Sequence, residues 1–364
     1  MKKFGFRVDA ALYIGAGHVM RCLTLADSLR AKGHQCHFIC REHPGHLVQK
    51  IKGLGFDVYI LPIATISNTE LKLGPYTQWL GADWPTDAQQ TSLVLKALNL
   101  DWLIIDHYAI DRDWEELIQR QHPHLKIMVI DDLANRHHHC RILLDQNLGR
   151  QASDYLSKVD AECRIFAGTE YVMLRSEFNR LRPYSLARRI TPQLNNILIS
   201  MGGIDNDNAT SIVLRTLEQT LMPISTKITA VIGASAPHVD HVKAIAARMP
   251  YSTEVVVNAN NMAQLIADSD LAIGASGSSS WERCHLGLPT LIVVLASNQQ
   301  TACQALEQEQ AAISIGHLSD IPIRLPSLIH SLFQKPQTLK KLSDRAAKLC
   351  NNAGFQQIIT QLLR

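Results

Sequence analysis

The chain has 364 residues, of which 46% are hydrophobic and 19% are charged, and its formal net charge is +3. This length is too great for one ordinary domain and fits two α/β domains, each with its own core. The composition excludes a disordered chain, and the small net charge gives no indication of nucleic-acid binding.

The sequence also lacks the usual signs of membrane insertion or export. Its longest apolar runs, such as 103–105 and 291–296, are far shorter than the roughly 20 residues of a membrane-spanning helix. Met1-Lys2-Lys3 leads directly into a predicted strand, which is unlike a signal peptide. The eight cysteines are scattered without a Cys-x-x-Cys pair, which is typical of reduced thiols. We therefore expect a cytoplasmic protein.

Predicted strands and helices alternate along the first half of the chain. We expect strands at 4–9, 36–40, 55–61, 102–106, 126–131 and 141–145, helices from 18 and at 43–52, 87–99 and 113–121, and a polar loop at 66–90. This order predicts a parallel sheet covered by helices on both faces. Ligands of such sheets bind beyond the carboxyl ends of the strands. Three motifs follow strands and should meet there, namely Gly17-His18, Asp106-His107-Tyr108 and Asp131-Asp132.

The second half of the chain repeats this pattern after an interruption. Two prolines and a basic cluster within 182–194 favour a linker at 183–194. Strands are then expected at 196–200, 227–232, 253–257, 271–273 and 290–295, with helices from about 208 and at 238–248 and 261–268. We therefore expect two Rossmann-like α/β domains, 1–182 and 195–364, that face a cleft, with a last helix that can pack back onto the first domain.

The stretch 5–26 carries the first candidate site. Gly15 and Gly17 allow a tight turn before a helix that begins near His18, and a helix start offers unpaired N–H groups and a positive dipole end. That dipole disfavours a protonated imidazole, so we expect a neutral His18 that can act as a general base beside an anion. Asp9, at the end of the preceding strand, is a candidate to orient it. The alternative is a plain tight turn with His18 as a helix cap.

A second candidate site lies in the C-terminal half. The small residues 276–280 open a helix and can bind a diphosphate through main-chain amides, and Glu282 can accept both hydroxyls of a ribose. Met201-Gly202-Gly203 follows another strand and can contact the same phosphates. The alternative is a pair of ordinary turns. No Gly-x-Gly-x-x-Gly follows the first strand and no Gly-Lys-Ser/Thr is present, which argues against the standard dinucleotide and P-loop sites.

Three other features have less specific interpretations. In the segment 137–140, His-His-His-Cys, neighbouring side chains of an extended chain point to opposite faces, so we expect no metal site. Tyr76, Trp79 and Trp84 could dock on a membrane or stack on a sugar, and acidic residues in the same loop weaken the membrane interpretation. Arg175 could form a surface ion pair or bind a substrate anion or carbonyl.

In their order and spacing, these motifs resemble the PseG family, the UDP-2,4-diacetamido-2,4,6-trideoxy-β-L-altropyranose hydrolases of pseudaminic acid biosynthesis. The resemblance runs from the first strand to about residue 300. It rests on Arg7-Val8-Asp9, Ile14 to His18 with Arg21, Trp79-Leu80-Gly81, Ile105 to Tyr108, Asp131-Asp132, Leu174 to Phe178, Met201 to Asp205, Ser276 to Glu282 and Asn298-Gln299. The segments 141–145 and 274–277 depart from the family pattern, in which we expect an asparagine at position 145.

The resemblance implies a glycosyltransferase-B-like (GT-B-like) fold used for hydrolysis with inversion, with UDP on the C-terminal domain and the sugar on the N-terminal domain. It implies that His18 is the catalytic base, that Tyr108 and Asn298 belong to the catalytic site, and that Arg175 and Glu282 bind substrate. The other expected substrate-binding residues are Gly17, Arg21, Asp106, Met201, Gly202, Gly203, Ser276, Gly277, Ser278, Ser279 and Gln299. We expect a UDP-sugar as partner and no cofactor, metal or nucleic acid, and a monomer is compatible with the sequence.

Two other functions are compatible with these residues. A glycosyltransferase that passes the same sugar to an acceptor would share the fold, so release of free sugar without an acceptor is needed to identify a hydrolase. A non-catalytic sensor would bind the UDP-sugar tightly without turnover, and it would leave the placement of His18 without a purpose.

Overall fold

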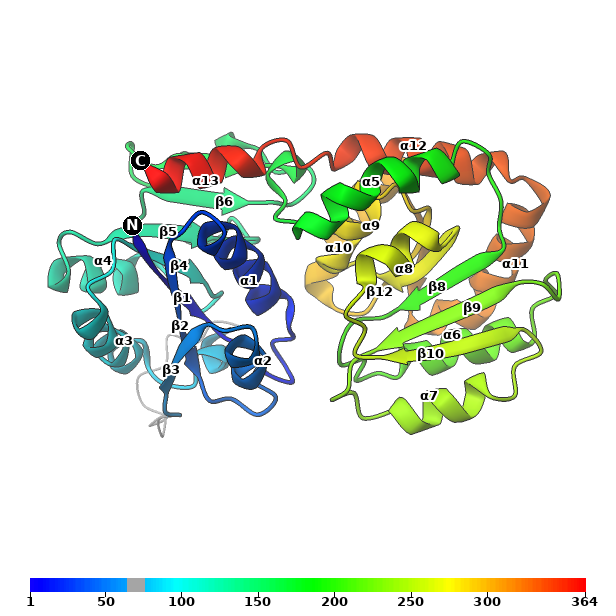
Figure 1. The fold of residues 1–364 in the computed structure, drawn as a ribbon, viewed down its shortest axis with the longest axis horizontal. Coiled ribbons are helices and arrows are strands. Elements are labelled where there is room, and N and C mark those ends of the chain that lie inside the picture. The colour runs from blue at the N-terminus through cyan, green and yellow to red at the C-terminus, as the bar shows by residue number, and fades with distance from the viewer. Residues whose placement is uncertain (64–75) are drawn as a thin grey trace. The chain divides into compact units, whose positions relative to one another are not determined.

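The chain forms two compact units in the computed structural model, which describes residues 1–63 and 76–364. The first unit contains residues 1–173 and 353–364, and the second contains residues 174–352 (Figure 1). Each unit is a parallel sheet with helices packed on it, and each is described by itself.

The sheet of the first unit has the strand order β3-β2-β1-β4-β5-β6-β7, and its neighbouring strands are parallel. The strands are β1 (Lys3–Val8), β2 (Gln35–Arg41), β3 (Asp57–Leu61), β4 (Trp102–Asp106), β5 (Lys126–Ile130), β6 (Ile142–Asp145) and β7 (Arg164–Ala167). The order reverses between β1 and β4. In doubly wound sheets the loops diverge at this point and leave room for a ligand.

The strand β4 shows why this sheet can be read from the sequence. Helices α1 (Gly17–Arg30), α2 (Val48–Gly53), α3 (Trp84–Leu98) and α4 (Arg112–Gln121) cover the sheet. Trp102 and Ile104 share a core with α1 and α2, whereas Leu103 and Ile105 share a second core with α3 and α4. Because successive side chains point to opposite faces and both faces are buried, the strand has to be a continuous apolar run.

The last helix, α13 (Phe355–Leu363), belongs to the first unit although it follows the second unit in the sequence (red in Figure 1). Phe355, Ile358, Ile359 and Leu362 recur at helical spacing and join the core that α1 forms with the sheet. The Lys2 ammonium also donates to the carbonyl oxygen of Leu362 at 3.2 Å. The first unit is therefore completed by the end of the chain.

The second unit has the strand order β10-β9-β8-β11-β12-β13. Its strands are β8 (Asn196–Ser200), β9 (Lys227–Ile232), β10 (Ser252–Val257), β11 (Leu271–Ala275), β12 (Thr290–Val294) and β13 (Ile313–His317). Its helices are α5 (Ser176–Arg188), α6 (Ala209–Glu218), α7 (Val239–Ala246), α8 (Met262–Asp268), α9 (Ser279–His285), α10 (Gln300–Gln308), α11 (Ile321–Gln334) and α12 (Gln337–Leu349). Here the order reverses between β8 and β11. Short 3₁₀ helices occupy Thr77–Leu80, Ala152–Asp154, Thr169–Tyr171, Ser297–Gln299 and Leu318–Asp320.

The segment predicted as a linker at 183–194 begins as a helix. α5 continues to Arg188 with Pro183 inside it, and the division between the units falls at 173/174. The arginines of this segment donate to main-chain carbonyls at the ends of other helices: Arg182 to Ala347, Arg188 to Ala267, and Arg189 to Ile266 and Ser269. Carbonyls at helix ends lack partners within their own helix, so these bonds hold α5 in place despite the proline.

Other elements differ from the prediction for local reasons. β7 and β13 each lie at the edge of a sheet and are only partly buried, so neither has the apolar run that marks the central strands. α3 begins at Trp84, inside the predicted loop, where the Asp83 side chain accepts a hydrogen bond from the Thr86 amide. Residues 66–75 of that loop lie outside the described residues. None of the helices within 1–63 and 76–364 has the length and hydropathy needed to cross a bilayer.

Candidate active site

The first candidate site lies at the carboxyl edge of the first sheet, where the strand order reverses. His18 is the second residue of α1, and its Nδ1 lies 2.7 Å from Oδ1 of Asp106, the last residue of β4. β1 and β4 are paired with Val8 opposite Asp106, so the loop from β1 into α1 carries the imidazole over the end of β4. The His18 side chain is 10% exposed, so solvent can still reach it.

Asp106 decides which ring nitrogen of His18 carries the proton. Burial alone would raise the pKa of Asp106, but the charge of Arg21 holds this pKa well below its ordinary value. The ionised carboxylate can only accept hydrogen bonds, so Nδ1 of His18 donates to it and the neutral ring has its lone pair on Nε2. Nη2 of Arg21 lies 3.2 Å from Nδ1 because both groups donate to the same oxygen of Asp106.

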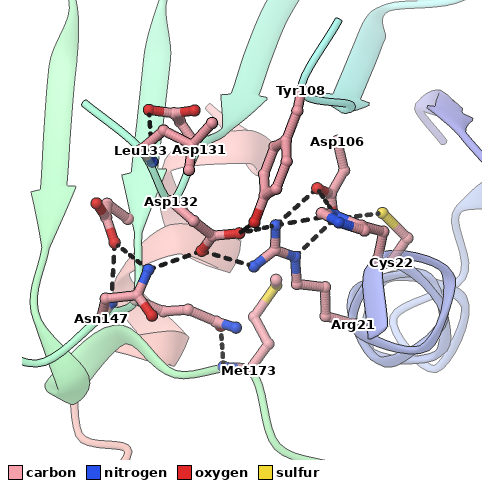
Figure 2. A network of polar contacts seen from close by, with 12 residues as sticks. Arg21, Cys22, Asp106, Tyr108, Asp131, Asp132, Leu133, Asn147 and Met173 are labelled. Carbon is pink, nitrogen blue, oxygen red and sulfur yellow. Dashed lines mark hydrogen bonds and ion pairs between the residues drawn. The ribbon is translucent and has the colours of Figure 1, made fainter. Parts of the chain in front are cut away.

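Arg21 connects this pair to a second carboxylate (Figure 2). Its Nε donates to Asp106 at 2.6 Å, and its two terminal nitrogens donate to Asp132 at 2.9 and 2.7 Å. The Tyr108 hydroxyl also donates to Asp132, at 2.6 Å. Arg21 and Asp106, which we expected to bind substrate, are therefore held by partners within the protein and position His18. Asp132 belongs to the Asp131-Asp132 motif that we expected at this edge, although we had assigned it no role in binding or catalysis.

A further carboxyl group extends this network. Asn147 donates to Asp132 and to Asp145, both at 2.8 Å, and the Tyr155 hydroxyl lies 2.7 Å from Asp145 and 2.9 Å from Asp131. Burial, and then the negative charge of Asp132, raises the pKa of Asp145 to about 7. This carboxyl group therefore holds its proton to a higher pH than an exposed aspartate does.

Aromatic rings border His18 on one side. The Tyr108 ring meets the imidazole edge-on with 4.7 Å between ring centres, and it stacks on Trp79 at 5.3 Å. Tyr76 contacts both of these rings, at 5.0 and 4.8 Å. Trp79 thus lies beside the imidazole with Tyr76 against it, whereas Trp84 packs on the core that α3 and α4 share.

Asp9 does not orient His18, contrary to our expectation. Val8 packs in the core beneath α1, so its neighbours Arg7 and Asp9 point to the opposite face of the sheet. There Arg7 forms ion pairs with Asp9 at 2.8 Å and with Asp87 at 2.6 Å. The period of two residues along a strand therefore takes Asp9 away from the imidazole.

The start of α1 retains the main-chain groups that the sequence predicts. Gly15, with φ of +85°, makes the turn, and Gly17 is the first residue of the helix. Ala16 precedes the helix, and no side chain caps its first N–H groups. These donors are compatible with an anion beside His18.

The second candidate site lies at the carboxyl edge of the second sheet. The loops that follow β8 and β11 adjoin there, because Ser200 is paired with Gly274. A Cβ placed on Gly203 or Gly277 would meet no atom within 4 Å, and Gly202 has φ of +102°. The main chain of both loops is therefore open to close approach by a ligand.

A buried arginine lies beneath the second of these loops. Arg283 in α9 donates to the Ala275 carbonyl at 2.8 Å and to the hydroxyls of Ser279 and Ser280 at 3.0 Å each. Among the described residues no carboxylate forms an ion pair with it, and burial lowers its pKa to about 10. The hydroxyl of Ser276 is also buried without a hydrogen-bond partner there. An unpaired cation and an unpaired hydroxyl under one loop are complementary to an anion. Arg283 was not among the expected residues, because one arginine inside a helix carries no motif.

Glu282 and Arg175 come together in the second unit. The Glu282 carboxylate lies 3.8 Å from Arg175, which also pairs with Glu177 at 3.0 Å. Burial raises the pKa of Glu282 to about 6, although a quarter of its side chain is exposed. Arg175 thus makes an ion pair, which was one of its two interpretations. Its partner Glu282 is itself one of the residues that we expected to bind substrate.

The remaining predicted residues of this unit differ in their exposure, and Ser278 is exposed whereas Met201 is buried. The Met201 side chain is buried in the core, so only its main chain can contact a ligand. Ser278 directly precedes α9, and the Gln299 side chain accepts a hydrogen bond from the Leu295 amide at 3.1 Å. The side chain of Asn298 lies outside the described part of the structure.

The histidine run in the first unit has separate partners. His138 lies 2.8 Å from Glu115 and His139 lies 2.6 Å from Asp160, as expected for neighbours that point in different directions. Across the described residues, no three His, Cys, Asp or Glu side chains are arranged to hold a metal ion.

Comparisons with known proteins agree with this architecture. Residues 193–362 match the glycosyltransferase family 28 C-terminal domain. Over 84% of its length the chain is 26% identical to the UDP-2,4-diacetamido-2,4,6-trideoxy-β-L-altropyranose hydrolase of Campylobacter jejuni, covering 93% of that protein. Its fold is similar to that of MurG from Acinetobacter baumannii, with a TM-score of 0.68 and 17% identity over 100% of this chain and 99% of the other. It is also similar to UDP-GlcNAc 2-epimerase from Neisseria meningitidis bound to UDP-GlcNAc, with a TM-score of 0.63 and 13% identity over 100% of both chains.

Two Rossmann-like units with these structural neighbours show that the chain has the GT-B fold. Most of the chain is similar in sequence to that hydrolase of Campylobacter jejuni, and its second half matches the family 28 C-terminal domain.

Proposed function

We propose that this protein hydrolyses a UDP-linked 2,4-diacetamido-2,4,6-trideoxy sugar at its anomeric carbon, releasing UDP and the free sugar with inversion. The observation that carries the proposal is the His18–Asp106 pair, in which Nδ1 donates to the carboxylate and Nε2 is left to take a proton. The similarity to the hydrolase of Campylobacter jejuni supports the choice of substrate. The coarser conclusion, a role in processing a UDP-linked sugar, also agrees with the GT-B fold.

In this proposal His18 acts as the general base. Its Nε2 takes a proton from a water molecule while the water oxygen bonds to the anomeric carbon. The bond from that carbon to the phosphate oxygen breaks on the opposite face, and UDP leaves with the electron pair. Ionised Asp106 stabilises the imidazolium that results, and a single displacement of this kind inverts the anomeric configuration.

We assign UDP to the second unit. The open loops at 201–203 and 276–278 support this, because their main-chain N–H groups can approach a diphosphate, and Arg283 brings positive charge beneath one of them. Glu282 is assigned to the ribose hydroxyls. Because UDP is a good leaving group, accurate positioning and one base supply the main catalytic terms.

Two variants test these assignments together. His18→Phe should lower kcat by at least about 100-fold and leave the Kd for UDP unchanged, because UDP is assigned to the other unit. Glu282→Ala should mainly raise KM. The measurement is NMR of purified protein with candidate UDP-diacetamido sugars, which follows UDP and the anomeric form of the free sugar. Turnover that survives in His18→Phe while UDP affinity is lost would refute the proposal.

A glycosyltransferase is the second candidate, and the match of 193–362 to the family 28 domain favours it. The same NMR experiment without any acceptor separates the two. Stoichiometric free sugar identifies the hydrolase, whereas turnover that begins only when an acceptor is added identifies the transferase.

A further inference from the structure

A cavity of about 840 Å³ lies in the first unit, at the edge of the sheet opposite to His18. Trp102, Lys126, Ile142 and Arg164 line it, and they are the first residues of β4 to β7. The candidate active site lies at the carboxyl ends of the same strands. The five residues of β4 separate the two places by roughly 13–17 Å. The cavity is therefore distinct from the candidate active site, and it has the volume of a small-molecule site.

Cations outnumber carboxylates in the lining of this cavity, which contains Lys126, Arg141, Arg164 and Arg364 with Asp160 and Glu162. Both carboxylates already have basic partners: Glu162 pairs with Arg141, and Asp160 pairs with His139 and with an arginine of α4. Both negative charges of the lining are thus neutralised by ion pairs within the protein.

Lys126 and Arg164 are exposed to solvent and are not used in this way. Within residues 1–63 and 76–364, neither has a carboxylate partner, and Arg164 donates to the neutral amide of Gln361 at 2.7 Å.

Trp102 supplies an independent observation. It is 3% exposed and lines the cavity, and its indole Nε1 has no hydrogen-bond partner in the described structure. Lys126 Nζ lies 5.5 Å from the centre of its ring. An anion with several acceptor oxygens can pair with the cations of the lining, and its arrival would change the surroundings of this indole.

We propose that this cavity binds a small organic phosphate at a site separate from the candidate active site. Lys126 and Arg164 hold the phosphate group, because a guanidinium matches two of its oxygens. Trp102, Leu125 and Pro123 offer apolar surface to the organic part. Sugar phosphates and nucleotides share this chemistry, and the proposal does not depend on the hydrolase activity.

The indole Nε1–H resonance of Trp102 tests this proposal in the full chain. It is assigned by its loss in Trp102→Phe and followed during titration with glucose 1-phosphate, with adenosine monophosphate and with uncharged glucose. We expect a saturable shift with at least one of the phosphates, which identifies the ligand class, and no shift with glucose.

Two charge-matched double variants complete the experiment. Lys126→Glu with Arg164→Glu should weaken the phosphate titration at least tenfold. Lys50→Glu with Lys52→Glu, which changes net charge equally at exposed positions of α2, should leave it unchanged. If the first variant does not fold, Lys126→Gln alone should still weaken the titration severalfold. No saturable shift with either phosphate, an equal shift with glucose, or equal affinity in the two double variants would overturn the proposal.

Discussion

The proton on His18 is placed by Asp106, a residue 88 positions further along the chain. The carboxylate accepts hydrogen bonds from the imidazole, from Arg21 and from the Cys22 thiol, and Arg21 also donates to Asp132. The orientation of the base thus rests on side chains that come from α1, from the end of β4 and from the residues that follow β5.

Asp106→Asn should lower kcat by roughly 10²–10⁴ with a much smaller change in KM. The amide can donate to Nδ1 of His18, which moves the ring proton to Nε2 and removes the acceptor for water. Asp132→Asn is the matched control, since it also takes one carboxylate from Arg21 but does not touch His18. Steady-state kinetics on both variants make the comparison, and equal losses of kcat would argue against a role for the tautomer.

Asp145→Asn should stabilise the protein at high pH and not at low pH. Burial and Asp132 raise the pKa of Asp145 to about 7, so the folded state holds its proton more tightly than the unfolded state. The resulting penalty is absent below about pH 4, grows up to about pH 7 and stays constant above it. We expect a gain of on the order of 1–3 kcal/mol near pH 8.

The control for this prediction is a measurement of the same variant at a lower pH. Urea unfolding near pH 4.5 and near pH 8 should give a difference between variant and parent at the higher pH only. The variant loses the ion pair of Asp145 with Arg150 at 3.0 Å, which limits the gain. A difference that is the same at both pH values would contradict the assigned pKa shift. Asparagine is also the residue that the family resemblance leads us to expect at this position.

At the scale of elements, two segments owe their places to contacts distant in sequence. α5 is fixed by arginines that donate to the ends of other helices, and α13 is fixed by apolar side chains in the core of the first unit. Neither contact can be read from the segment itself, because the same arginines or apolar residues would suit an exposed linker or a different core.

Ile358→Ala should destabilise the first unit by about 2–4 kcal/mol, because it leaves a cavity where α13 meets the sheet. Gln357→Ala, at an exposed position of the same helix, should change stability by less than about 0.5 kcal/mol. Native-state hydrogen exchange of amides in β5 and β6 reports the stability of this unit. Equal protection in the two variants would mean that α13 does not contribute to its core.

At the scale of the whole molecule, both units place their candidate residues where the strand order reverses. In our proposal the first unit supplies the base that acts on the sugar, and the second unit binds UDP.

UDP should slow hydrogen exchange in the second unit, at 201–208 and 274–282, and have little effect at 17–22. This expectation follows from the open loops after β8 and β11 and from the buried charge of Arg283. Mass-spectrometric hydrogen exchange with UDP at about 100 times its Kd makes the measurement, and inorganic phosphate serves as the ligand control. Protection confined to 17–22 would place the nucleotide in the first unit instead.

The sequence alone determined the class of the fold. Alternating βα segments, with apolar runs such as 103–105, predicted two Rossmann-like domains, and this fold class is confirmed. Local signals also sufficed for the turn at Gly15 and for a helix start near His18, because a turn and a helix start depend on a few neighbouring residues. The resemblance to the PseG family was equally visible in short motifs and is confirmed.

Only the tertiary structure decided which residues meet. Asp106 and not Asp9 orients His18, because β4 lies beside β1 and the alternation along β1 turns Asp9 to the other face. Arg283 lies under a loop without a carboxylate partner among the described residues, and the structure shows which residues of α13, the helix that we expected could pack back, enter the core of the first unit. These outcomes depend on the order of the strands and on the face of the sheet to which each side chain points. The whole chain sets both features, because it has to bury the two apolar faces of a sheet at once, and no short segment contains that information.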